Sequence, residues 1–124
     1  MWQVLVISQH IGLRTLLTTL FKRGGHHVDA VTSRAEALPI IAHGLHNLII
    51  LDLYLSDEPG LDLASDLRAR YPQLPMLFIS STVLDAPVPE EDIHAAAQLG
   101  INIFQRSIAS HDFNSVIQDL LNRA

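Results

Sequence analysis

The sequence has no cysteine, which excludes disulfide bonds, thiolate chemistry and cysteine-based zinc sites. Aromatic residues form only 6% of the chain, so a core must be built mainly from Leu, Ile, Val and Ala. Positive charge is scarce and scattered, with eight Lys and Arg against thirteen Asp and Glu, and this argues against direct nucleic acid binding. No apolar run approaches the length of a membrane span, and the N-terminus lacks the basic region of a signal peptide. We therefore expect a cytoplasmic protein without membrane contact.

The chain contains a regular alternation of strand and helix patterns. Its 124 residues, of which 48% are hydrophobic, suit one domain with a real core. Unbroken apolar runs at 4–7, 48–51 and 76–79 predict strands that are buried on both faces. The stretches 27–32 and 101–105 alternate between apolar and polar residues, which predicts two edge strands, with Ala30 on the apolar side of the first.

Helices are predicted between these strands, because apolar residues recur there on one helical face. Ser33 and Glu36 form a capping box that opens the second helix, and Pro39 should kink or shorten it. Asp66 and Arg70 are spaced for an ion pair on the third helix. The expected helices cover 13–23, 34–43, 61–71, 89–99 and 111–121. Five strand–helix units predict a single α/β domain over 1–124, a doubly wound (βα)5 fold with a five-stranded parallel sheet.

One carboxylate stands at the chemically important end of this sheet. Asp52 directly follows the buried run 48–51, and ligands of open parallel sheets bind at the carboxyl ends of the strands. Polar residues follow the other strands at the same end, namely Ser8-Gln9, Ser80-Ser81 and Arg106-Ser107. We therefore expect these side chains to gather around Asp52.

Three motifs occur in an order that resembles the receiver domain of bacterial two-component response regulators. They are the Asp52 strand with its loop to Gly60, the strand 76–79 that ends in Ser80, and the segment 95–104. The resemblance implies a flavodoxin-like fold with strand order 2-1-3-4-5. It also implies that Asp52 is the phosphoacceptor position for a histidine kinase in a phosphorelay, and that Ser80 and Phe104 are the switch positions. In this family two acidic residues help to hold Mg²⁺, and a lysine contacts the phosphoryl oxygens.

The sequence departs from this pattern around Asp52. Ser8 and Gln9 occupy the acidic-pair position, and neither can supply a charged ligand for Mg²⁺. Ser107 occupies the lysine position, while the adjacent Arg106 should point the other way on a strand of period two. We therefore expect a degenerate receiver, or pseudo-receiver, without a metal cofactor.

Three functional readings follow from these residues. The leading one is a signalling domain, not an enzyme, that acts through contacts with an output domain, a histidine kinase or another signalling protein. The family also suggests a homodimer through the fourth helix, fifth strand and fifth helix. A second reading keeps phosphorylation of Asp52, with a rearranged metal site that uses Asp57 or Glu58 on the neighbouring loop. A third is a flavodoxin-like binder of small ligands, although no phosphate-binding glycine loop follows the first strand.

Histidines supply two weaker candidates. His26-His27 and the pair His43 and His46 have side chains that suit zinc, and His10 lies close enough to Asp52 to sense pH. A solvated loop position is the simpler interpretation of His10. The chain ends where the last helix of a receiver would end, which fits either a single-domain regulator or part of a longer protein.

Overall fold

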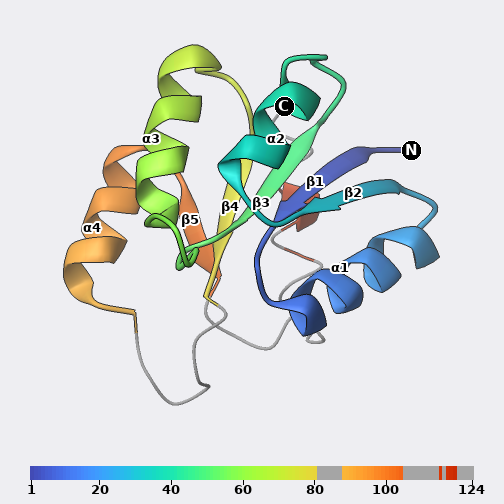
Figure 1. Cartoon of the computed structure of the whole chain (residues 1–124), viewed down its shortest axis with the longest axis horizontal. Helices are drawn as coiled ribbons and strands as arrows, with labels where there is room; N and C mark the ends of the chain where they lie inside the picture. Colours follow the sequence, from blue (N-terminus) through green and yellow to red (C-terminus); the bar gives the residue numbers. More distant parts are fainter. Residues whose placement is uncertain (81–87, 105–114, 116, 120–124) are drawn as a thin grey trace.

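A computed structural model describes residues 1–80, 88–104, 115 and 117–119, and the statements below refer to these residues. Five parallel strands form one sheet in the order β2-β1-β3-β4-β5, and four helices flank it (Figure 1). This confirms the predicted fold class and strand order. The strands are β1 Gln3–Ile7, β2 His27–Val31, β3 Leu48–Asp52, β4 Met76–Ile79 and β5 Asn102–Phe104. The helices are α1 Ile11–Arg23, α2 Arg34–Ile41, α3 Gly60–Arg70 and α4 Glu90–Gln98.

Helices cover both faces of the sheet, as a doubly wound fold requires. One apolar cluster joins the sheet to α2, α3 and α4, and a second joins it to α1 and Ile117. The middle strands β1, β3 and β4 are almost wholly buried, whereas β2 and β5 at the edges are partly exposed. None of the helices in the described ranges is long and apolar enough to cross a membrane.

Some residues on the expected apolar faces are exposed, including Ile93 on α4, which is 40% exposed. Ala30 on β2 is exposed, and Val31 is the one residue of this edge strand that is fully buried. Leu16, one of the recurring apolar residues of the helix predicted at 13–23, is also 40% exposed, so the buried face of α1 is narrower than its sequence indicates. For Ala30 the reason is the position of β2 at the edge of the sheet, where a strand is only partly covered.

The helix ends follow local sequence signals. The Ser33 hydroxyl accepts a hydrogen bond from the Glu36 amide at 3.3 Å, as the predicted capping box requires. The Glu36 carboxylate, however, accepts from the amide of Thr32 at 2.9 Å and not from that of Ser33. Helix α2 contains Pro39 and is only eight residues long, in line with the expected short helix. The predicted fifth helix lies largely outside the described residues, although Ile117 is helical and buried.

Gly60 allows α3 to begin directly beside the end of β3. Its amide donates to the carbonyl oxygen of Leu53 at 2.9 Å. A Cβ atom at this position would lie 2.2 Å from the carbonyl oxygen of Asp52 and 3.0 Å from the Cα of Leu53. Because these neighbours are backbone atoms, they cannot turn aside as a flexible side chain would.

We predict that Gly60→Ala lowers the free energy of unfolding by roughly 1–3 kcal/mol, because the added methyl group forces α3 away from β3. Urea unfolding measures this loss. Ser65→Ala, at an exposed position of the same helix, should change stability by no more than about 0.5 kcal/mol. Equal effects of the two substitutions would contradict the close approach.

Candidate functional site

Asp52 is the last residue of β3, and its carboxylate is buried, with 2% of the residue exposed. The hydroxyl of Ser8 donates to Oδ2 at 2.8 Å, and the amide of Tyr54 donates to Oδ1 at 3.1 Å. A buried carboxylate is tolerated only when hydrogen bonds replace its lost water. Each oxygen of Asp52 therefore has a partner within the protein.

Ser8 is held so that its one hydroxyl proton points to Asp52. The residue is 1% exposed and directly follows β1, the neighbour of β3 in the sheet. Its own oxygen Oγ accepts a hydrogen bond from the amide of His10 at 3.1 Å. Its backbone amide donates to Val31 at 3.0 Å, and its carbonyl accepts from Arg14 at 2.8 Å. Ser8 is thus a fixed, uncharged donor to the carboxylate.

Gln9 connects the two loops that flank this site. Its side-chain oxygen Oε1 accepts a hydrogen bond from the amide of Ser56, in the loop between β3 and α3, at 2.6 Å. The amide side chain carries no charge and its oxygen is already occupied. At the two acidic-pair positions, Ser8 therefore binds Asp52 and Gln9 binds the neighbouring loop, both through hydrogen bonds.

The two alternative metal ligands, Asp57 and Glu58, have different surroundings. Asp57 is exposed to solvent. Glu58 is bound by Arg34 of α2, with Nη2 to Oε1 at 2.7 Å and Nε to Oε2 at 3.0 Å. Arg34 also contacts Asp66 at 2.6 Å, so the expected Asp66–Arg70 pair is wrong. The two carboxylates hold the pKa of Arg34 above its ordinary value, with Glu58 the larger cause.

Mg²⁺ does not fit the donor set around Asp52. Octahedral Mg²⁺ needs several hard oxygen ligands, and carboxylates are preferred among protein groups. Here one carboxylate is present, and the Ser8 proton occupies one of its oxygens. Across the described ranges, no group of three or more His, Asp or Glu side chains is placed to hold a metal ion.

The two switch positions lie at the same end of the sheet. Ser80 directly follows β4 and is half-buried, and it has an interaction partner within the protein. Phe104 ends β5 beside Ile79 and is 7% exposed, within the apolar cluster that includes Ile117. Ser81, Arg106 and Ser107 lie outside the described residues.

Tyr54 is a site residue to which the sequence assigned no role. Its amide binds Asp52, and its hydroxyl donates to Asp92 of α4 at 3.3 Å. Burial raises the pKa of its phenol, and the neighbouring Asp92 adds to the shift. Any residue type can supply a backbone amide, so the identity of Tyr54 does not indicate this contact. Its position two residues after Asp52 is the only sequence feature that could have done so.

The histidines take separate structural roles. His10 caps α1, because its Nδ1 accepts from the amide of Leu13 at 3.1 Å. His26 stacks on Trp2 with ring centroids 4.5 Å apart, and burial lowers its pKa. His27 and His46 both contact Asp29, while His43 is exposed. The expected zinc pairs therefore do not gather into a metal site within the described part of the chain.

Comparisons with known proteins agree with this geometry. The Response regulator receiver domain model matches residues 4–105. Response regulator protein FleR of Pseudomonas aeruginosa is 34% identical over 79 residues, which cover 64% of this chain and 17% of FleR. Two-component response regulator PhoP of the same organism is 35% identical over 79 residues, covering 64% of this chain and 35% of PhoP. The chain thus spans only a minor part of the length of these relatives.

A solved structure shows the same fold. The response regulator receiver domain protein (CheY-like) from Methanospirillum hungatei superposes with a TM-score of 0.83. The match covers 99% of this chain and 95% of that one, at 15% identity. With the family model spanning most of the chain, this protein belongs to the response regulator receiver domain family, the signalling domain of two-component regulators.

Proposed function

We propose that this domain is a pseudo-receiver, which signals in the cytoplasm through protein contacts and without Mg²⁺-dependent phosphorylation of Asp52. One observation carries the proposal. The Ser8 hydroxyl donates to the Asp52 carboxylate at 2.8 Å, at the position where the family has an acidic residue. A neutral donor satisfies Asp52 at a place where a phosphorylation site needs a metal ligand.

Electrostatics supports this reading. Phosphoryl transfer brings several anionic oxygens to the acceptor carboxylate, and a metal ion and a fixed cation must neutralise them. Ser8 and Gln9 supply no charge for a metal, and Ser107 stands at the position of the family's lysine. A phosphoryl group on Asp52 would therefore place negative charge in a buried site where neither Ser8 nor Gln9 can help to neutralise it.

The alternative with a rearranged metal site has a specific cost. Glu58 is more buried than Asp57, but Arg34 binds both oxygens of the Glu58 carboxylate. Metal binding by Glu58 would break this ion pair and leave Arg34 with Asp66 alone. Asp57 then remains as the one carboxylate of that loop without a described partner.

The hydrogen bonds around Asp52 suggest how the domain responds to partners. Gln9 joins the loop after β1 to the loop after β3, and Tyr54 joins that second loop to Asp92 on α4. A protein that binds α4 or either loop can therefore change the same set of hydrogen bonds, those of Gln9, Tyr54 and Asp92. The partners that we propose are an output domain, a histidine kinase or another signalling protein. A second copy of this domain is a further candidate, through α4, β5 and the fifth helix.

Incubation with acetyl phosphate and Mg²⁺ should leave the mass of the intact protein unchanged, because Ser8 and Gln9 supply no charged metal ligand and Ser107 supplies no cation at the position of the family's lysine. Intact-protein mass spectrometry measures this, with a phosphorylatable receiver treated in parallel. An adduct of one phosphoryl group that disappears in Asp52→Asn would contradict the proposal.

Restoring two acidic residues should create a metal site. In Ser8→Asp/Gln9→Asp, three carboxylates meet at the end of the sheet, so their repulsion lowers stability until Mg²⁺ binds. We predict that the unfolding temperature of this variant rises with Mg²⁺ concentration, as for any ligand of the native state.

The unsubstituted protein should show no such rise, and adding Asp52→Asn to the variant should reduce it. Thermal unfolding over a series of Mg²⁺ concentrations compares the three proteins. A rise of the same size in the unsubstituted protein would show that its own site holds the metal.

A further inference from the structure

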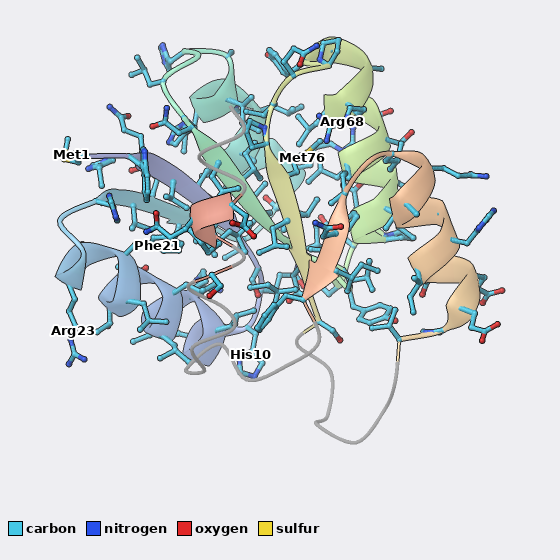
Figure 2. All side chains as sticks on the ribbon, turned by 180° about the vertical axis from the view of Figure 1, so that it is seen from behind. Met1, His10, Phe21, Arg23, Arg68 and Met76 are labelled. Carbon is cyan, nitrogen blue, oxygen red and sulfur yellow. The ribbon has the colours of Figure 1, made fainter. Side chains whose placement is uncertain are left out.

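His26 joins the start of β1 to the end of α1, at the opposite end of the sheet from Asp52. Its backbone amide donates to the carbonyl oxygen of Phe21, in the last turn of α1, at 3.0 Å. Its ring accepts a hydrogen bond at Nδ1 from the backbone amide of Trp2, at 3.1 Å. Figure 2 shows Met1 and Phe21 on the same side of the molecule. One half-buried histidine thus connects two segments that lie 24 positions apart in the sequence.

The ring of His26 is held on several sides. It stacks on the indole of Trp2, with ring centroids 4.5 Å apart and an angle of 17° between the planes. The ring of Phe21 meets it edge-on, with centroids 6.3 Å apart. A Cβ atom added at Gly24 would lie 3.2 Å from Nε2 of His26, so the glycine leaves room for the imidazole. The indole in turn packs against the apolar cluster that joins α1 to the sheet.

This geometry requires a neutral imidazole. A backbone amide can only donate, so Nδ1 of His26 must carry a lone pair, and the one proton of the neutral ring lies on Nε2. Protonation would place a second N–H group directly opposite the N–H of Trp2, and the hydrogen bond would be lost. Burial lowers the pKa of His26, and the positive N-terminus lowers it further, in the direction that keeps the ring neutral at pH 7.

The charged groups on the neighbouring elements do not favour a protonated His26. Lys22 and Arg23 lie in the last turn of α1, and the N-terminal ammonium precedes β1, so all of these groups are positive. The carboxylate on β2, Asp29, is bound by His27 and by a further histidine. Within the described part of the chain, no carboxylate therefore pairs with the ring of His26.

We propose that His26 forms an acid-sensitive contact, which holds Trp2 and the start of β1 against α1 at neutral pH and releases them on protonation. A histidine whose pKa is lower in the folded than in the unfolded chain stabilises the fold in its neutral form. Its contribution is complete above about pH 6.5, the ordinary pKa of histidine, and is lost as the pH falls through the lowered pKa. This contact is separate from Asp52, so its test does not depend on the function proposed above.

Nuclear magnetic resonance of labelled protein, from about pH 8 to about pH 4.5, observes both sides of the contact. We expect the ring of His26 to titrate below about pH 6.5, and the amide proton of Trp2 to move upfield with the same midpoint as its hydrogen bond is lost. Trp2 is the one tryptophan of the chain, so its fluorescence also reports the release. Its emission maximum should shift to longer wavelengths as the indole enters water.

Two results in the unsubstituted protein would overturn the proposal. One is a midpoint for His26 at or above the ordinary value, as a cation–π attraction between a positive ring and the indole would produce. The other is a set of Trp2 signals that stay constant over this pH range or change with a different midpoint.

Two substitutions separate His26 from the other histidines, of which the chain has seven in all. His26→Phe keeps an aromatic ring beside Trp2 but has neither an acceptor nor a titrating group, so both Trp2 signals should stay constant with pH. His27→Phe, at the exposed neighbouring position, should leave the transition and its midpoint unchanged. A transition that persists in His26→Phe would overturn the proposal, and the titration of the unsubstituted protein decides the question if this variant folds poorly.

Discussion

The buried carboxylate of Asp52 is the constraint on which the functional end of this domain depends. Its two oxygens lie out of reach of bulk water, so the protein must supply their hydrogen bonds. Parallel pairing of β1 with β3 sets Ile7 opposite Leu51, which brings the next residues, Ser8 and Asp52, side by side. The hydroxyl of Ser8 donates to one carboxylate oxygen of Asp52, and the backbone amide of Tyr54 donates to the other.

The loops near Asp52 are joined to each other and to α4 by hydrogen bonds. A metal ion would bridge the loops by charge, whereas here neutral side chains bridge them by hydrogen bonds. Gln9 binds Ser56, and the Tyr54 side chain continues the connection to Asp92 on α4. The same loop is fixed from its other side by the ion pair of Glu58 with Arg34. The loop between β3 and α3 is therefore held from two sides by contacts within the described part of the protein.

The sequence predicted the parts of this site that follow from regular structure. Carboxyl ends of parallel strands meet at one edge, so the contact between Ser8 and Asp52 required only the strand assignments. The contacts of Arg34 with Glu58 and Asp66 could not be predicted, because they join residues 24 and 32 positions apart through the path of a loop. The hydrogen bond from the Tyr54 amide to Asp52 was missed, because every residue type except proline carries a backbone amide and the sequence does not mark which one is used. His10 was read as a loop residue, since histidine is an uncommon helix cap.

A double-mutant cycle between Ser8 and Asp52 tests the central interaction most directly. Unfolding free energies would be measured in metal-free buffer for the unsubstituted protein, Ser8→Ala, Asp52→Ala and the double variant. A hydrogen bond to a buried charged carboxylate predicts a coupling energy of about 1.5–3 kcal/mol. A coupling within about 0.5 kcal/mol of zero would show that Ser8 does not hold the Asp52 carboxylate and would contradict the account.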